Sequence, residues 1–433
     1  MSAGADVAVM GWRRIVAARP ATGTAPLAVL DIGTSKLCCF IARPRAGRGF
    51  TVIGRGYQVA EGIRGGDIAD AEAADAALRA VLHEAEVQAG ERLREVAVTL
   101  SGGRPRSSHV RVTADLAGRT VTDGELDRLL RLAHDRVEDD RRAVIHVVPL
   151  AVTIDGGRPL LDARGMSGQQ LEMLAHVITL RREALHDILA LLERSHVAVR
   201  GVVVASYAAG LGCLTADELD RGCLVLDMGA GTTGLSLFAN GRIAFVDQVP
   251  YGGDHVTADL AFGLATTRAH AERIKNLYGS VLWRACDDNQ RITVPLIGDA
   301  VHQPTGEVPR TRLTQIARAR VEEILDLVEQ RLADAGELVA ACPPRSVVLT
   351  GGASEIEGLV ELTQERFGLP ARLGRPDADC GVGPDTGPCC ASVGGALALA
   401  AGDDRGLAWS ETRETDPLTR MVHRIRRWIG ENF

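Results

Sequence analysis

Continuous hydrophobic runs occur at two distant places in the chain, and each is broken by a short polar turn. The first run covers residues 27–41 with its turn near 33–36, and the second covers 223–238 with its turn near 229–233. Runs that are apolar at every position are typical of strands buried on both faces. Each run therefore predicts a strand–turn–strand unit. Asp31 and Asp227 stand 196 residues apart (227 − 31), which indicates two related halves.

Helical and strand patterns alternate through the rest of both halves, which predicts an α/β fold. The predicted helices cover 71–90, 182–195, 255–262, 267–278, 312–335, 355–367 and 393–401. Further strands are predicted at 50–54, 96–100, 177–180, 197–204 and from 346 to the double glycine at 351–352.

Residues 104–176 have a different pattern, which predicts a small α+β unit inserted in the first half. Strand-like pieces at 109–113, 143–150 and 151–154 surround one helix. That helix is expected to begin after Thr122, with Glu125 at capping-box spacing, and to continue through His134.

Composition narrows the class of protein. The 433 residues are 46% hydrophobic and 24% charged, with a net charge of −7, as in a soluble globular chain of several domains. The acidic balance argues against a general nucleic-acid binder. The chain has no run of about 18 apolar residues that would predict a membrane-spanning helix.

The nine cysteines show no spacing typical of a zinc site. We interpret them as small buried hydrophobic residues in a reducing compartment. Cys380, Cys389 and Cys390 share a stretch rich in glycine and proline, where a redox or metal role is the alternative interpretation.

The two polar turns carry the residue types that bind phosphate. A tight turn exposes backbone N–H groups, to which Thr and Ser hydroxyls add further donors. Lys36 can add a positive charge, and Asp31 and Asp227 can hold a hydrated Mg²⁺. A single turn of this kind also joins ordinary hairpins. Two such turns, followed by a third turn at Gly351 and Gly352, favour a nucleotide site.

The last segment of the chain has its own signal. Asp416 and Pro417 are suited to begin a helix, and apolar residues follow at spacings of three or four. The predicted membrane-contacting residues are Leu418, Met421, Val422, Arg424, Ile425, Arg427, Trp428 and Ile429. Trp and Ile on one face with Arg beside them are typical of an interfacial helix on anionic lipid. Packing of this stripe on the protein's own core is the alternative.

Several stretches together resemble the FtsA family of bacterial cell-division proteins, within the actin-like ATPase superfamily. They are LAVLDIGTSK at 27–36, CLVLDMGAGTTGLSLF at 223–238, IAFVDQVPYGGDHVTADLAFGL at 243–264, AERIK at 271–275 and VVLTGGASEIEGL at 347–359. The resemblance covers about residues 26–402 and the tail, and its motifs stand in the family's order.

The resemblance implies an actin-like two-lobe ATPase fold with duplicated mixed sheets, an FtsA-type inserted α+β subdomain and a C-terminal amphipathic helix. The implied divisions are a disordered extension at 1–25, a first lobe at 26–100 and 177–215, the inserted subdomain at 101–176, a second lobe at 216–255 and 339–402, its small subdomain at 256–338, a linker at 403–415 and a membrane-targeting helix at 416–433.

The resemblance also implies a site for ATP and Mg²⁺, and no catalytic residue is predicted. The first phosphate loop would be Gly33, Thr34, Ser35 and Lys36, and the second would be Gly229, Gly231, Thr232 and Thr233. Asp31 and Asp227 would face the metal, largely through water. Glu272 and Lys275 would reach the ribose and adenine, and Gly351, Gly352, Ala353 and Ile356 would form the adenosine wall. Glu272 and Lys275 could instead be an exposed ion pair.

Two positions depart from the superfamily pattern. Gly234 stands where many of these ATPases carry Asp, and Ala230 where many carry Gly. Loss of a carboxylate near the phosphates weakens the activation of water. We therefore expect firm nucleotide binding with slow or negligible hydrolysis.

The function that the resemblance implies is a polymerising adaptor at the division site. It would lie on the cytoplasmic face of the inner membrane, bind the C-terminal peptide of FtsZ through 256–338, and recruit later division proteins. The alternatives are a small-metabolite kinase of the same superfamily, a pilus-assembly or rod-shape actin-like protein, and a chaperone ATPase. Only about 30 residues follow Gly402, too few for a chaperone's peptide-binding domain.

Overall fold

The computed structural model describes residues 26–45, 49–137, 139–284, 288–297, 305–377, 381–382 and 386–401. The predicted extension at 1–25, linker at 403–415 and amphipathic helix at 416–433 lie outside these residues, as do Cys286 and Cys380. Of the helices that the structure describes, none has the length and apolar character needed to cross a bilayer.

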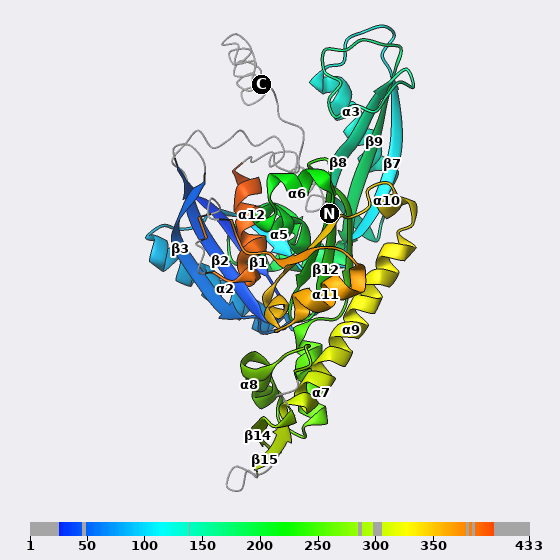
Figure 1. Ribbon diagram of the computed structural model, residues 1–433. Coiled ribbons are helices and arrows are strands. Elements are labelled where there is room, and N and C mark those ends of the chain that lie inside the picture. The colour runs from blue at the N-terminus through cyan, green and yellow to red at the C-terminus, as the bar shows by residue number, and fades with distance from the viewer. Residues whose placement is uncertain are drawn as a thin grey trace.

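Two five-stranded sheets of the same topology form the body of the molecule (Figure 1). The first has the order β10-β6-β1-β2-β3 and the second the order β13-β12-β11-β16-β17. The strands of the first are β1 (Leu27–Ile32), β2 (Lys36–Pro44), β3 (Phe50–Val59), β6 (Glu95–Leu100) and β10 (Ala198–Val204). Those of the second are β11 (Cys223–Met228), β12 (Thr233–Ala239), β13 (Arg242–Val249), β16 (Ser346–Thr350) and β17 (Ala371–Leu373).

The pairing within the sheets confirms the duplicated mixed sheets expected from the two hydrophobic runs. In each sheet the first strand pairs antiparallel with the next strand and parallel with a later one. Asp31 lies opposite Thr99 across the parallel pair, and Asp227 lies opposite Thr350 at the equivalent place. We call the part built on the first sheet the first lobe and the part built on the second sheet the second lobe.

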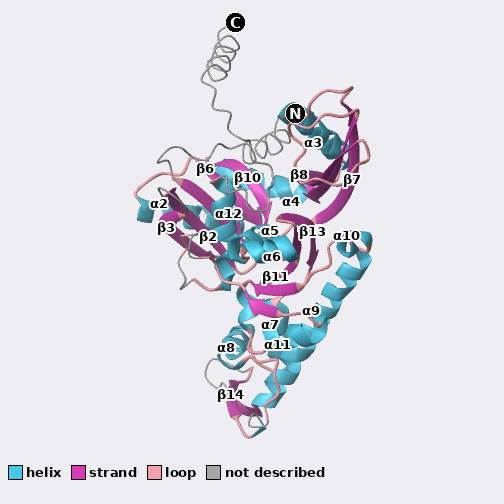
Figure 2. Cartoon of the chain, turned by 45° about the horizontal axis from the view of Figure 1, so that its top comes forward, coloured by secondary structure: helices cyan, strands magenta, loops and turns pink. Residues whose placement is uncertain are grey.

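Helices cover the sheets and fill the space between them (Figure 2). They are α2 (Ala71–Ala89), α4 (Arg182–Arg194), α5 (Ala205–Cys213), α6 (Ala216–Arg221), α10 (Glu337–Ala340), α11 (Leu359–Phe367) and α12 (Ala391–Ala400). The structure also has the 3₁₀ turns η2 (Gly352–Glu355) and η4 (Pro388–Cys390) and a short hairpin of β4 (Ile63–Arg64) and β5 (Asp67–Ile68). Every residue of α5 and α12 is buried. A Cβ on Gly395 of α12 would lie 1.7 Å from the Ala208 carbonyl oxygen of α5, so the two backbones touch there.

The inserted unit is a three-stranded antiparallel sheet with one helix, at the upper right in Figure 1. Its elements are β7 (Arg106–Asp115), α3 (Asp123–Val137), β8 (Arg142–Ile154) and β9 (Gln170–Arg181), in the strand order β7-β9-β8. The two pieces predicted at 143–154 are one strand with register shifts. Helix α3 begins at Asp123, directly after Thr122 as the capping-box spacing predicts. The Glu125 carboxylate accepts a hydrogen bond from Arg119 at 2.6 Å.

The inserted unit is attached to the edge of the second-lobe sheet by side chains that bind the free carbonyls of β13. His109 Nε2 lies 2.7 Å from the Ala244 oxygen, and His176 Nδ1 lies 2.9 Å from the Ile243 oxygen. In the other direction, buried Arg242 donates to the carbonyls of Pro149 and Leu161 at 2.6 and 2.7 Å. These hydrogen bonds to backbone carbonyls explain why the charged Arg242 side chain is stable in the interior.

Two buried histidines of the inserted unit, His146 on β8 and His176 on β9, predict a loss of stability in acid. Burial lowers the pKa of His146 and of His176 to about 3, from an ordinary value of 6.5. Between those two pH values the unfolded chain binds protons that the folded chain excludes, so the free energy of unfolding falls as the pH falls. Urea unfolding from pH 7 to 4 should show this slope. His146→Phe should reduce this slope by up to about one proton, and His186→Gln, at an exposed side chain, is the control variant.

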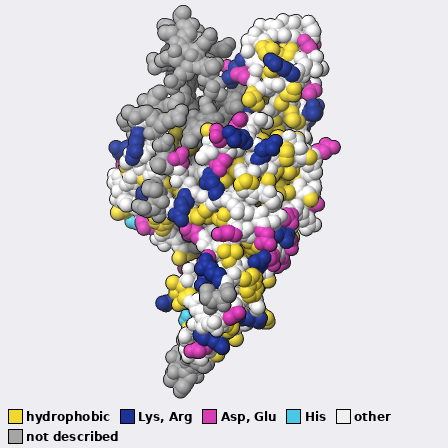
Figure 3. Space-filling model, in the orientation of Figure 1, with side chains coloured by type: hydrophobic (Ala, Val, Ile, Leu, Met, Phe, Trp, Pro, Cys, Tyr) yellow, Lys and Arg dark blue, Asp and Glu magenta, His cyan; other side chains and the backbone are white. Residues whose placement is uncertain are grey.

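A narrower unit projects at the lower end of Figure 1. It contains α7 (Gly253–Gly263), α8 (Arg268–Tyr278), α9 (Arg310–Asp334) and the hairpin of β14 (Arg291–Pro295) and β15 (Thr305–Pro309). Hydrophobic side chains are visible on this unit among charged ones in Figure 3. Phe262 at the end of α7 is 92% exposed, and Trp283 is 50% exposed.

Candidate functional site

The two polar turns lie against each other between the lobes. Each is closed in the same way, by a hydrogen bond from the Gly33 N–H to the Lys36 oxygen at 3.2 Å and from the Gly229 N–H to the Thr232 oxygen at 2.9 Å. A Cβ on Gly231 would lie 2.6 Å from the Thr34 hydroxyl oxygen. Only glycine therefore allows the second turn to approach the first this closely.

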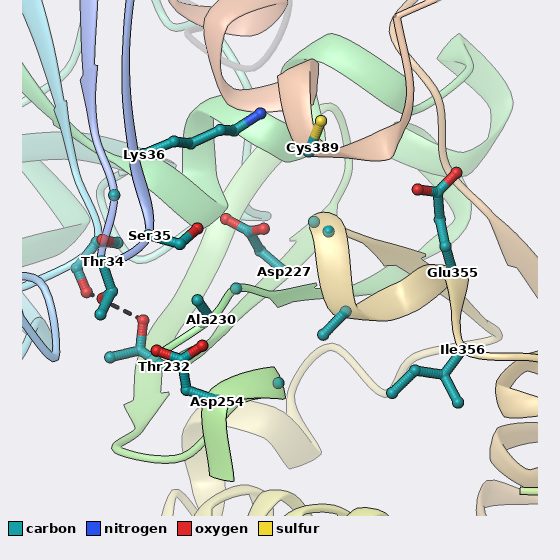
Figure 4. A pocket seen from close by; sticks show the side chains of 18 of the residues that line it. Thr34, Ser35, Lys36, Asp227, Ala230, Thr232, Asp254, Glu355, Ile356 and Cys389 are labelled. Carbon is teal, nitrogen blue, oxygen red and sulfur yellow. Dashed lines mark hydrogen bonds between the residues drawn. The ribbon is translucent and has the colours of Figure 1, made fainter. Parts of the chain in front are cut away.

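A cavity of about 570 Å³ lies beside the paired turns (Figure 4). The structure brings together on its walls every residue predicted to bind nucleotide except Gly231 and Thr233. Gly231 packs against Thr34, and the buried Thr233 hydroxyl donates to the Tyr251 oxygen at 2.8 Å. These two residues shape the second turn from behind.

The two aspartates face this cavity from the ends of β1 and β11. Asp31 accepts hydrogen bonds from Thr99 and, at 3.1 Å, from Ser392. Burial raises the pKa of Asp31. Burial and the neighbouring charge of Asp31 together raise the pKa of Asp227 to about 7. The carboxylates are thus held in a position where a cation would relieve both desolvation and their mutual repulsion.

This donor set fits a hydrated Mg²⁺ rather than a fully protein-ligated metal. In the described part of the chain no three His, Cys, Asp or Glu side chains converge on one point. Mg²⁺ keeps several waters and needs only one or two carboxylates with the phosphates of its nucleotide. Asp31 and Asp227 are the residues that would hold it.

Glu272 and Lys275 form a partly buried ion pair on α8. Their charged atoms are 2.7 Å apart, and the Lys275 side chain is only 9% exposed. Lys275 also donates to the Thr257 hydroxyl at 2.9 Å and to the Gly253 oxygen at 3.2 Å. Burial alone would raise the pKa of Glu272, but hydrogen bonds from Lys275 and Thr257 lower it. Lys275 is therefore fixed to the first turn of α7 rather than free on an exposed helix face.

The double-glycine turn forms the opposite wall. Gly351 has φ of +82°, and a Cβ there would lie 2.5 Å from the Met228 oxygen. Gly352 is different, because the nearest atom to its Cβ position is the Cys389 Cβ at 3.8 Å and the rest of that space is cavity. The first glycine is required by the fold, and the second opens the cavity.

The departure at Gly234 has a steric reason. A Cβ at this position would lie 2.7 Å from the Ser206 Cβ of α5. An aspartate side chain does not fit there unless α5 moves. The chain therefore lacks space, as well as a carboxylate, at this place beside the cavity.

Sequence reasoning missed several polar residues that line the cavity. They are Ser101, Ser206, Gln248, Asp254, Asn276, Arg310, Glu355, Glu357, Cys389 and Ser392. Asp254 directly follows the sequence Tyr-Gly-Gly, and its N–H donates to the Ala230 oxygen at 2.8 Å. Asp254 lies within the stretch at 243–264 that carries the resemblance, so the sequence does contain a signal for it. Cys389 and Ser392 have no such signal, because only folding brings η4 and α12 to the turns.

Comparison with known proteins shows the family of this chain. A family model described as "Cell division protein FtsA" matches residues 224–395, and one described as "SHS2 domain inserted in FTSA" matches 102–179. A cell division protein FtsA of Rhizobium meliloti is 40% identical over 362 residues, which cover 81% of each chain. The chain belongs to the FtsA family of cell-division proteins.

Other relatives extend the FtsA match along almost the whole chain. The FtsA of Agrobacterium fabrum is 34% identical over 94% of this chain and 95% of its own, and that of Escherichia coli is 26% identical over 93% and 97%. The match of the inserted unit to the SHS2 domain found in FtsA explains its position between β6 and α4.

Solved structures show the same actin-like fold. A chain of the PilM–PilN type IV pilus biogenesis complex has a TM-score of 0.59 at 19% identity and covers 87% of this chain and 99% of its own. MreB5 of Spiroplasma citri bound to ADP has a TM-score of 0.53 at 15% identity and covers 86% and 95%.

Proposed function

We propose that this FtsA-family chain binds ATP with Mg²⁺ in the cavity between its lobes and works as a polymerising membrane adaptor for FtsZ. The observation that carries the nucleotide part is the meeting of two equivalent glycine turns at one cavity, each preceded by an aspartate, Asp31 buried and Asp227 partly buried. The fold relative MreB5 was solved with ADP, which supports a nucleotide ligand for this architecture.

In this proposal each wall of the cavity has a separate task. The N–H groups of the two turns, with the hydroxyls of Thr34 and Thr232, bind phosphate oxygens. Asp31 and Asp227 would hold a hydrated Mg²⁺, which would supply positive charge to neutralise that of the phosphates. Glu272 and Lys275 bind the ribose and adenine beside the turn of Gly352.

We propose that hydrolysis is slow. At Gly234 the chain has neither a carboxylate nor the space for one, since Ser206 occupies it. Two other carboxylates on the cavity wall, Asp254 and Glu355, are assigned to neither the metal nor the ribose. Neither of these carboxylates pairs with an arginine of the described chain at less than 3.5 Å. A nucleotide that persists would act as a lasting conformational signal, as an adaptor requires. The same steric block at Gly234 makes the small-metabolite kinase a weaker alternative.

The FtsZ part of the proposal rests on family membership and on the exposed apolar side chains of 256–338. We propose that the FtsZ C-terminal peptide binds this unit, where Phe262 and Trp283 offer apolar surface. The chain would lie at the division site on the cytoplasmic face of the inner membrane, and its polymer would recruit later division proteins. One short amphipathic helix binds lipid reversibly, so assembly of many copies should strengthen attachment by avidity.

Co-sedimentation with anionic vesicles tests the adaptor. The full chain should pellet with the vesicles, and Mg·ATP should increase the bound fraction because polymerisation adds avidity. A chain ending at Thr415 should stay in the supernatant with and without ATP. Binding by both chains would refute the assignment of residues 416–433 as the membrane helix, and failure of both would refute membrane attachment.

A further inference from the structure

Cys389 occupies an unusual place for a thiol, on the wall of the cavity and at the start of a helix. It stands in η4, directly before Cys390, which is the N-cap of α12. Cys389 is partly exposed, whereas Cys38, Cys39 and Cys390 are buried. Figure 4 shows its sulfur and the Lys36 amine on the same side of the cavity, above Asp227.

Three features of this place stabilise a thiolate. The Cys390 sulfur lies 3.9 Å from the Cys389 sulfur and can donate its S–H. The positive charge of Lys36 lies on the same side of the cavity as the Cys389 sulfur. The N-terminus of the ten-residue helix α12 adds its partial positive charge. The hydrogen bond from Cys390 and the charge of Lys36 hold the pKa of Cys389 well below its usual range, and the same hydrogen bond together with burial raises the pKa of Cys390.

We propose that Cys389 is a reactive thiolate that peroxides oxidise to a sulfenic acid, and that a nucleotide in the cavity shields it from this reaction. The shielding rests on the proposed nucleotide site, whereas the reactivity does not. In the reaction the Cys389 sulfur attacks one oxygen of hydrogen peroxide. An S–O bond forms as the O–O bond breaks, the sulfur gives up two electrons, and the leaving hydroxide takes a proton from solvent to become water.

Cys390 acts as a hydrogen-bond donor here and not as the thiol that resolves the sulfenic acid. Consecutive Cα atoms are about 3.8 Å apart, which is shorter than the Cα separation of about 4.4 Å or more in ordinary disulfides. A bond between adjacent cysteines would therefore be strained. The sulfenic acid of Cys389 should persist long enough for dimedone to trap it.

The rate of alkylation by iodoacetamide as a function of pH tests the thiolate directly. Residue-resolved mass spectrometry of the intact full chain should show a rate at Cys389 that is nearly constant from pH 6.5 to 8.5. Cys342 is the matched control, because it is also partly exposed and burial raises its pKa. Its rate should rise about tenfold per pH unit over the same range. Lys36→Gln should move the inflection of Cys389 to higher pH.

Peroxide followed by dimedone completes the test. The adduct should form at Cys389 in the wild type, not at Cys342, and Mg·ATP should slow its formation on the order of tenfold. Cys389→Ser should remove the adduct while thermal melting shows that the variant is folded. A rate at Cys389 that rises with pH as that of Cys342 does would overturn the reactive thiolate. A constant, fast rate that Mg·ATP leaves unchanged would overturn the shielding and count against the nucleotide site alone.

Discussion

Replacing Gly395 by alanine should lower the free energy of unfolding by about 3 kcal/mol, although alanine favours helices more than glycine does. The added Cβ would lie 1.7 Å from the Ala208 oxygen and 2.8 Å from the Gly212 nitrogen, which are backbone atoms of α5. Backbone atoms cannot move aside as a flexible side chain can, so α12 and α5 must separate. All residues of both helices are buried, so separation opens space in the centre of the molecule.

Urea unfolding of Gly395→Ala beside Gly124→Ala measures this effect. Gly124 lies in the first turn of α3, and the nearest atom to its Cβ position is the Thr122 hydroxyl oxygen at 3.7 Å. Alanine fits there without displacement and should be neutral or stabilising by up to about 1 kcal/mol. If Gly395→Ala were as stable as Gly124→Ala, the close contact of α5 and α12 would be wrong.

The strand–turn–strand units could be predicted because their signal is local. A continuous apolar run with a polar break depends only on neighbouring residues, and β1, β2, β11 and β12 lie where the runs predict them. The third strand of the first sheet was harder to predict. β3 extends to Val59, five residues beyond the predicted end. The prediction stops short because Arg55 and Gln58 interrupt the apolar pattern of this edge strand.

Helix α5 shows why other elements could not be predicted. Its sequence ASYAAGLGC has two glycines and no polar face, so no helical period is visible in it. Gly210 and Gly212 lower helix propensity, yet each lies where a side chain would meet Phe238 or the Ala391 oxygen. The requirement for small residues comes from neighbours that are distant in sequence, which a local pattern does not contain.

The candidate site also has one part that local motifs predict and another part that they do not. Its glycine turns and aspartates belong to local motifs, so the resemblance could name them as candidates from the sequence alone. The interpretation of the cysteines as buried hydrophobic residues holds for Cys38, Cys39 and Cys223, but Cys389 differs because η4 lies on the cavity wall. Ser392 could not be predicted as a site residue either, because its hydroxyl donates to Asp31, which lies 361 residues away in the sequence.

Replacing Gly352 by leucine should weaken the binding of Mg·ATP at least about 100-fold, or roughly 2.7 kcal/mol, and leave the ligand-free protein folded. The space beyond its Cβ position is the cavity itself, where, apart from the neighbouring residues of the chain, the Cys389 Cβ is the one described atom within 4 Å. A leucine side chain therefore occupies the volume proposed for adenosine without displacing the wall. Gly352→Ala adds one carbon and should have a much smaller effect on the same affinity.

The neighbouring Gly351 supplies the contrast that makes the result decisive. Its φ of +82° and the 2.5 Å approach to the Met228 oxygen mean that Gly351→Ala strains the protein itself. Thermal melting should therefore separate the two positions. Gly351→Ala lowers the melting temperature without ligand, whereas Gly352→Leu keeps it and loses the increase that saturating Mg·ATP gives the wild type. If Gly352→Leu bound Mg·ATP as tightly as the wild type, the nucleotide would have to bind elsewhere, and the proposed assignment of this cavity would be wrong.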